Sequence, residues 1–180
     1  LQPVVMQIGQ AAGALSALAC IENKKVHEVG VRQVQEVLLE AGCYIMPYLD
    51  LPKDDQHFKV LQRIGATGIL RGEGRNVGWS NETWFRADDP LKGEDLHVAE
   101  FYGAIVIEPG EISVGRMLDL VRIYGGKIPS VSEEEWWNML GLSDFDRSRT
   151  ATRLEAAVVI DAAFDPFRMF DVDYKGRFRM

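Results

Sequence analysis

The sequence predicts a mainly α fold, made of a helical hairpin followed by a multi-helix module, with little or no β structure. Apolar residues recur at the helical period over the first 41 residues. Two later segments have the capping-box form that starts a helix, Ser132 with Glu135 and Thr152 with Glu155. With 180 residues, 47% of them hydrophobic and 26% charged, the chain is long and apolar enough to form a globular core.

The first 47 residues are predicted to form the helical hairpin. Its first helix spans about residues 3–22, because Pro3 suits a first turn and Asn23 tolerates the left-handed backbone that ends a helix. Its second helix spans about residues 31–41 and stops at Gly42. Cys20 and Cys43 have no metal or redox spacing, and we expect buried free thiols rather than a disulfide.

Residues 48–180 are predicted to form the multi-helix module. A helix follows Asp54 and Asp55 and ends by Gly68, and further helices follow Pro90, Ser113 and the two capping boxes. Residues 71–89 resemble a loop but contain two tryptophans, which lie either over the helices as a lid or against a ligand. The tail from residue 170 to residue 180 is expected to contribute at most one edge strand.

The net charge, the length of the apolar runs and the first residues of the chain indicate which kinds of partner to expect. A net charge of −7 disfavours broad contact with polyanions, so we expect no nucleic acid partner. No uninterrupted apolar run reaches the roughly 20 residues that cross a bilayer, so we expect no membrane span. The sequence begins Leu1-Gln2-Pro3, without an initiator methionine, and we expect a piece of a longer protein.

No pattern in the sequence indicates a catalytic or metal site. The histidines, His27, His57 and His97, are too far apart for a helical metal site. The acidic pairs fall at predicted helix starts, where the helix dipole accounts for them. Asp144 and Asp146 are followed by arginines where a calcium loop needs oxygen ligands. We therefore predict no catalytic residue and no metal ligand.

The opening helix carries a small-residue segment, Gly9-Gln10-Ala11-Ala12-Gly13. Small side chains let a flat ligand or another helix approach closely, and ordinary helix packing explains the pattern equally well. Residues 2–14 (QPVVMQIGQAAGA) and 31–42 (VRQVQEVLLEAG) resemble the C-terminal end of a family of bacterial FAD-dependent oxidoreductases, some members of which are named xanthan lyase.

This resemblance implies that the segment lies against FAD in a parent flavoprotein. The cofactor-binding residues would be Gly9, Gln10, Ala11, Ala12 and Gly13. The chain has no strand-linked G-x-G-x-x-G loop, so its partner would be a missing N-terminal flavin-binding domain. We expect no FAD in this piece and no enzymatic activity from it alone.

The second module resembles surface-layer homology repeats. The resemblance rests on residues 68–72 (GILRG), 85–91 (FRADDPL) and 152–157 (TRLEAA), whereas residues 92–95 and 113–116 are looser copies of the last motif. It implies that Arg153 binds an acidic cell-envelope polysaccharide. Aromatic platforms and arginine forks suit acidic sugars, so the candidate carbohydrate-binding residues are Trp79, Trp84, Arg86 and Arg153.

Three hypotheses about function therefore remain open. The chain is the C-terminal part of an FAD-dependent oxidoreductase-like protein, or a carbohydrate-binding or cell-envelope attachment module, or a structural interaction domain. The compartment also stays open, with the periplasm and the cell surface as the places where a polysaccharide-binding module would act.

Overall fold

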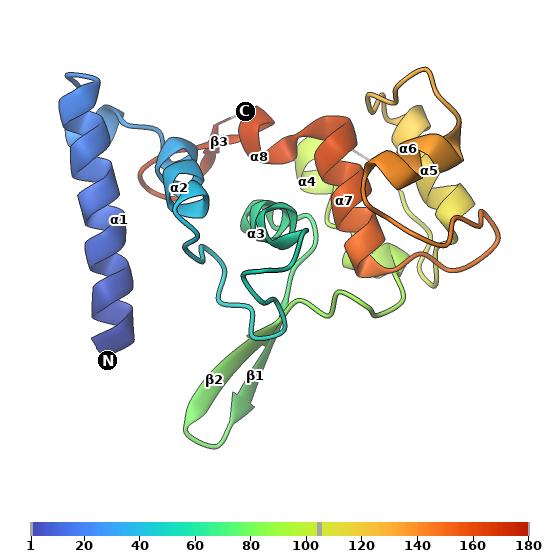
Figure 1. Ribbon diagram of the computed structural model, residues 1–180, viewed down its shortest axis with the longest axis horizontal. Coiled ribbons are helices and arrows are strands. Elements are labelled where there is room, and N and C mark those ends of the chain that lie inside the picture. Colours follow the sequence, from blue (N-terminus) through green and yellow to red (C-terminus); the bar gives the residue numbers. More distant parts are fainter. Residues whose placement is uncertain (1, 104–105, 180) are drawn as a thin grey trace. The chain divides into compact units, whose positions relative to one another are not determined.

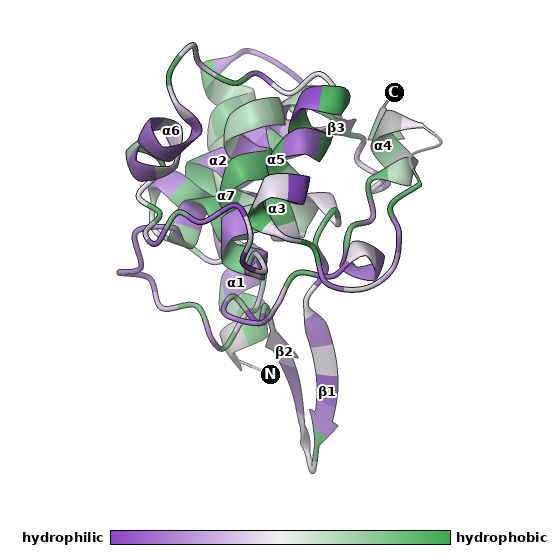
Figure 2. Cartoon of the chain, turned by 90° about the vertical axis from the view of Figure 1, so that its right-hand side faces the viewer, coloured by the Kyte–Doolittle hydropathy of each residue, from purple (hydrophilic) through white to green (hydrophobic). Residues whose placement is uncertain are grey.

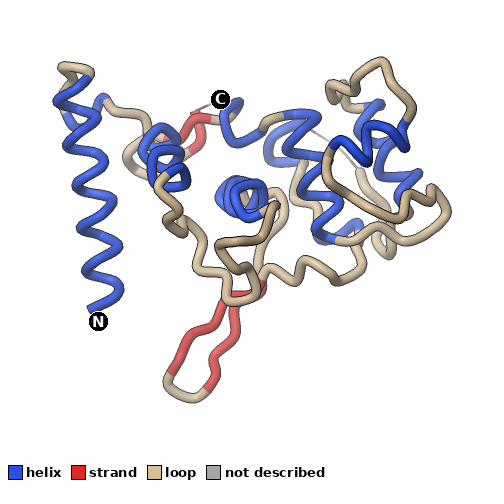
Figure 3. Tube along the Cα trace, in the orientation of Figure 1, coloured by secondary structure: helices blue, strands red, loops and turns tan. Residues whose placement is uncertain are grey.

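The computed structural model describes residues 2–103 and 106–179 (Figure 1). The chain divides into two compact units, one formed by Leu1–Met46 with Phe167–Met180 and the other by Pro47–Pro166. With 46% helix and 13% strand, the structure is a mixed α/β fold, and the prediction of a mainly α fold with little or no β is wrong. Figure 3 shows the reason, because two segments expected to be largely irregular form antiparallel hairpins.

The first unit contains a long helix and a short one. Helix α1 spans Gln2–Ile21, a single turn η1 spans Val26–Glu28, and helix α2 spans Val31–Glu40. The C-terminal half of α1 packs on α2 through a small core of Ala19, Val29 and Val34. The N-terminal half of α1 exposes its apolar side chains, with Met6 71% exposed. Both cysteines are free thiols, but neither is buried as predicted, because Cys20 is exposed and Cys43 is half-buried.

The C-terminal tail belongs to the first unit. It comprises helix α8 (Pro166–Met169) and strands β3 (Asp171–Val172) and β4 (Phe178–Arg179), which pair as a hairpin instead of one edge strand. Arg32 of α2 lies 4.5 Å from the ring centre of Phe167 and donates from Nε to the carbonyl of Phe170 at 3.3 Å. Burial lowers the pKa of Arg32 to about 10. This cation therefore joins the tail to α2.

The second unit is built around helix α7 (Arg153–Phe164). Its residues are buried on all sides, as expected of a central helix, and α3 (Phe58–Thr67) and α5 (Val114–Ile123) pack against it. Thr152 and Glu155 form the predicted capping box at its start, with bonds of 3.2 and 2.8 Å. The remaining helical segments are η2 (Gly93–Asp95), α4 (Ala99–Tyr102) and α6 (Glu133–Met139).

Three extended segments form a closed ring of backbone hydrogen bonds in this unit. The N–H of Leu91 donates to Ala151, that of Ala151 to Ile112, and that of Ile112 to Leu91, at 2.7, 2.9 and 3.0 Å. All three residues are buried. Each segment leads directly into a helical turn, η2, α5 or α7. The ring therefore brings the starts of three helical elements to one place.

A hairpin of strands β1 (Glu73–Val77) and β2 (Ser80–Trp84) extends from the helices of the second unit, and Figure 2 shows that its strands consist largely of hydrophilic residues. Its tip is a two-residue turn in which Gly78 has a φ of 60°, the left-handed backbone that glycine adopts without strain. At its base, Glu73 pairs with Trp84, and Leu49 donates a backbone hydrogen bond to Thr83. The base is thus fixed to the unit while the tip is solvent-exposed.

Candidate functional site

A polar cavity of about 450 Å³ lies in the second unit, between the hairpin base and the start of α7. Charged side chains dominate its lining. The cations are Arg71, Arg86, Lys92 and Arg153, and the acids are Glu73, Asp89, Asp95 and Glu111. Since these residues come from four separate parts of the chain, the fold itself assembles the site.

Arg153, the first residue of α7, is fixed in the wall of this cavity. Its side chain is only 8% exposed, and its Nε and Nη2 donate to the carbonyls of Phe85 and Arg71 at 3.1 and 2.7 Å. Its Nη1 lies 3.3 Å from a carboxylate oxygen of Asp95. The guanidinium also lies 5.3 Å from the ring centre of Phe85. Arg153 therefore holds the hairpin base against α7 and presents a cation of fixed orientation.

Arg86, which also lines the cavity, has an unusual backbone conformation. Its φ is 61°, which a non-glycine residue adopts only when its surroundings compensate. Asp50 provides that compensation, because its carboxylate accepts hydrogen bonds from the N–H groups of Phe85 and Arg86 at 2.8 and 2.7 Å. The guanidinium of Arg86 lies 4.9 Å from the Trp84 ring and 3.3 Å from Glu73.

Three of the acidic residues of the cavity are engaged within the protein. Glu73 accepts from Arg75 and Arg86, and these bonds, chiefly the one from Arg75, lower its pKa. Asp95 accepts from the backbone N–H of Lys92 at 3.1 Å, and Glu111 from the hydroxyl of Thr150 at 2.9 Å. Lys92 itself is exposed. Two of these acids thus pair with cations of the cavity, Glu73 with Arg86 and Asp95 with Arg153, so a bound anion would share these two guanidiniums with them.

The four predicted carbohydrate-binding residues fall in different places. Arg86 and Arg153 both line the cavity. Trp84 is half-buried beside it, with its ring against Arg86 and its indole N–H donating to Glu82. Trp79 sits at the hairpin tip, fully exposed and outside the cavity. Trp79 therefore does not cover the helices as a lid.

Two cations of the cavity, Arg71 and Lys92, were missed from the sequence. Arg71 comes just before the hairpin, and nothing in the local pattern links it to α7. The sequence did offer a pattern for Lys92. Residues 92–95 are a looser copy of the TRLEAA motif, and Lys92 occupies in that copy the position that Thr152 has in the motif. The hydrogen-bonded ring places these two equivalent positions next to the same cavity.

The predicted flavin-contacting segment lies in the middle of α1, in the first unit. Since α1 begins at Gln2, the N–H groups of residues 9–13 lie beyond the first turn and bond within the helix. Ala11 and Ala12 line a mainly apolar groove of about 660 Å³ between α1 and α2, whereas Gly9, Gln10 and Gly13 do not. A Cβ atom placed on Gly9 or Gly13 would meet nothing within 4 Å.

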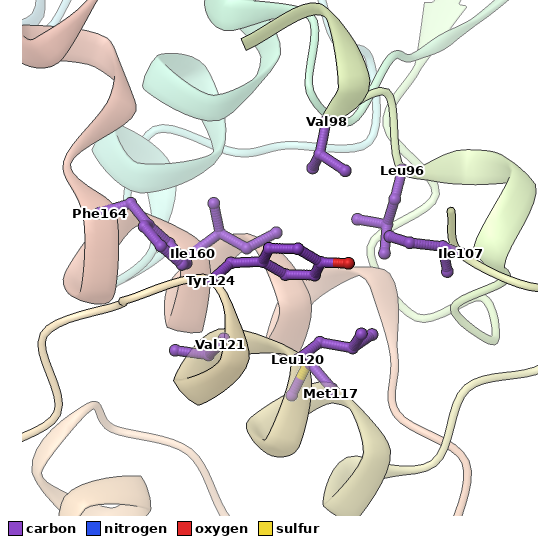
Figure 4. A pocket seen from close by; sticks show the side chains of 9 residues that line it. All are labelled: Leu96, Val98, Ile107, Met117, Leu120, Val121, Tyr124, Ile160 and Phe164. Atoms are coloured by element: carbon purple, nitrogen blue, oxygen red, sulfur yellow. The ribbon is translucent and has the colours of Figure 1, made fainter. Parts of the chain in front are cut away.

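A second cavity of the second unit is small and apolar. It measures about 50 Å³ and lies between α5, α7 and the segment that follows η2. Figure 4 shows the ring of Tyr124 extending across it, with the hydroxyl toward Leu96 and Ile107. Apart from that hydroxyl the labelled side chains are apolar, so this cavity offers a polar ligand a single hydrogen-bonding group among them.

The described residues were also compared with the requirements of a metal site and of a membrane-spanning helix. In the described part of the chain, no group of three or more His, Cys, Asp or Glu residues could hold a metal ion. Val4–Ile21 of α1 is long and apolar enough to cross a membrane by length and composition. A core helix or a signal sequence meets the same criterion, so the absence of a membrane span stays a prediction.

Comparisons with protein-family models, curated proteins and solved structures find no match for this chain.

Proposed function

We propose that the second unit is a binding module for an acidic polysaccharide, and that the polar cavity receives a carboxylate-bearing sugar. The observation that supports this best is the convergence of Arg71, Arg86, Lys92 and Arg153 on one cavity. Arginine binds carboxylates through two parallel N–H donors, which gives both affinity and orientation. The resemblance to surface-layer homology repeats points to the same ligand class.

The cations of this cavity suit binding because two of them are already oriented. Arg153 is held by two carbonyls and Arg86 by Asp50 and Trp84, so little side-chain entropy is lost when a ligand arrives. The acids that line the cavity also favour a ligand with hydroxyl donors over a compact inorganic anion. A sugar acid carries both kinds of group. Attachment to the cell envelope would be the biological role of such a module.

A binding assay with charge-matched variants tests this proposal. The probe is immobilised polygalacturonate, with dextran as the neutral comparison. Arg86→Ala and Lys92→Ala should each weaken binding about tenfold, since a charge-assisted hydrogen bond contributes about 1.5–3 kcal/mol before solvent screening. Arg116→Ala is the matched control, because Arg116 is an exposed cation of α5 that does not line the cavity. Equal binding by all four proteins, or no binding to polygalacturonate, would reject the proposal.

A second candidate function concerns the first unit. We infer from the flavoprotein resemblance that α1 completes a flavin site in a longer protein, in which case the missing N-terminal flavin-binding domain is its partner. Gly9 and Gly13 leave open space, which fits the flat face of a flavin ring. A bound flavin would supply hydride or electron transfer, and α1 would contribute only a surface without side-chain obstruction.

Flavin absorbance tests this second candidate. The chain of residues 1–180 alone should show none after dialysis, because it lacks a phosphate-binding glycine loop for the dinucleotide. Co-expression with a flavin-binding domain encoded upstream should give a yellow complex, which Gly9→Leu should weaken. A yellow protein from the chain alone, or an upstream sequence without a strand followed by G-x-G-x-x-G, would contradict this candidate.

A further inference from the structure

Trp79 is an exposed aromatic side chain at the tip of the β1–β2 hairpin. It follows Gly78 in the two-residue turn at the hairpin tip, and its exposure equals that of a fully solvated residue. Neighbouring Val77 is 50% exposed. A tryptophan carries about 150–250 Å² of largely apolar surface. At Trp79 this surface is uncovered and accessible to a ligand.

The hairpin connects this side chain to the polar cavity. Its base residue Glu73 lines the cavity and pairs with Trp84, whereas its last pair before the turn is Val77 with Ser80. Four residue steps separate the two pairs, or about 14 Å at the usual rise of a strand. A ligand that fills the cavity must therefore extend well beyond it to reach Trp79.

The composition of the hairpin favours a sugar over a membrane surface. Residues 76–81 at the tip contain no lysine or arginine, and attraction to anionic lipid headgroups needs such cations. The residues next to the tip, Asn76, Ser80 and Asn81, offer amide and hydroxyl groups. These groups can exchange hydrogen bonds with sugar hydroxyls, while the indole ring matches the apolar face of a pyranose ring.

We propose that Trp79 forms a second sugar subsite, which makes the ligand an extended acidic polysaccharide rather than a single terminal sugar. This inference rests on the proposed function of the cavity. One acidic residue of the polymer occupies the cavity, the chain runs along the hairpin, and a later residue stacks on Trp79. Affinity should therefore rise with the length of the saccharide until the ligand spans both subsites.

Calorimetric titration with galacturonic acid and with its oligomers up to the hexamer tests the inference. Trp79→Ala should lower affinity for the hexamer about tenfold, the upper range for an aromatic contact, and leave affinity for the monomer unchanged. Trp79→Phe should retain most of the hexamer affinity. Met139→Ala is the control, since Met139 is an exposed apolar residue of α6. The exposed tip makes a folding defect in the Trp79 variants easy to exclude by thermal unfolding.

The outcomes separate this inference from the proposed function. If the wild-type protein binds galacturonate and the hexamer equally, or if Trp79→Ala binds the hexamer like the wild type, the second subsite does not exist while the cavity proposal stands. If the wild type binds neither probe, both proposals fail. Sedimentation of the protein with phosphatidylglycerol vesicles that depends on Trp79 would identify the tip as a lipid contact and overturn the sugar subsite.

Discussion

The carboxylate of Asp50 accepts a 2.7 Å hydrogen bond from the backbone N–H of Arg86, whose φ of 61° lies in the left-handed region. Its other oxygen accepts from the preceding N–H, that of Phe85. A residue 36 positions away thus fixes the backbone turn that directs the Arg86 side chain toward Trp84 and Glu73. Asp50 is therefore a positioning residue of the polar cavity, although it does not line it.

Replacing Asp50 should lower the free energy of unfolding and release the backbone turn at Arg86. Asp50→Asn keeps one acceptor oxygen and loses the other together with the charge, so the free energy of unfolding should fall by about 1–3 kcal/mol. Urea denaturation measures the change. Asp54→Asn is the matched control, because Asp54 is exposed. A denaturation midpoint that both variants share with the wild type would show that Asp50 does not fix the turn.

Gly65 of α3 allows a close approach that no other residue permits. A Cβ atom on Gly65 would lie 2.2 Å from the hydroxyl oxygen of Tyr48. Gly65→Ala should therefore destabilise the second unit by about 1–3 kcal/mol despite the better helix propensity of alanine. Gly74→Ala, where a Cβ atom meets nothing within 4 Å, should be close to neutral. Combining Gly65→Ala with Tyr48→Phe should recover part of the loss, and strict additivity would contradict the contact.

The pKa of Tyr48 predicts how the free energy of unfolding changes at alkaline pH. Its hydroxyl is buried, and this burial raises its pKa to about 12. The folded state thus favours the neutral phenol, and this contribution is fully present below pH 10. It is lost as the pH rises from about 10 to about 12, by about 2.7 kcal/mol for a shift of two units.

Comparison with Tyr48→Phe isolates this effect. The stability of the variant relative to the wild type should rise between pH 7 and pH 11, because the variant has no phenol to ionise. Chemical denaturation at the two pH values measures the difference. Parallel pH profiles for the two proteins would show that Tyr48 ionises in the folded state as readily as in water.

Arg153→Lys should separate the structural role of Arg153 from its charge. A lysine keeps the cation but cannot donate to the carbonyls of Phe85 and Arg71 with the same fork. One buried carbonyl then loses its partner, so the free energy of unfolding should fall by about 1–3 kcal/mol. Arg116→Lys on the exposed face of α5 should have no effect. Thermal unfolding of the two variants measures the loss of stability. Coincident unfolding curves would show that the hydrogen bonds of Arg153 to Phe85 and Arg71 do not stabilise the unit.

Helix starts were predictable because their signals are local. Ser113, Ser132 and Thr152 each accept a backbone hydrogen bond from the third residue that follows. The predicted capping box is complete at Thr152, whereas at Ser132 only the bond from the Glu135 N–H forms. The segment after Pro90 was expected to be helical, yet only η2 and α4 form there. Its extended start is held by the ring of backbone hydrogen bonds, which joins residues that are distant in sequence and leaves no local pattern.

The β1–β2 hairpin was missed because its strands are polar on both faces. Without alternation of apolar and polar residues, residues 73–84 resemble a loop, and only Gly78 at the turn hinted at a hairpin. Arg86 and Arg153 could be named from motif resemblance. That they share a cavity with Arg71 and Lys92 follows from tertiary packing, which no local pattern records.

The central claim is that Arg86 and Arg153 form one site for a carboxylate-bearing sugar. Nuclear magnetic resonance of the arginine Nε–H groups during titration with galacturonate tests it most directly. The signals of Arg86 and Arg153 should shift together with one dissociation constant, while that of Arg116 stays fixed. Unchanged signals for Arg86 and Arg153 at saturating galacturonate would contradict the claim.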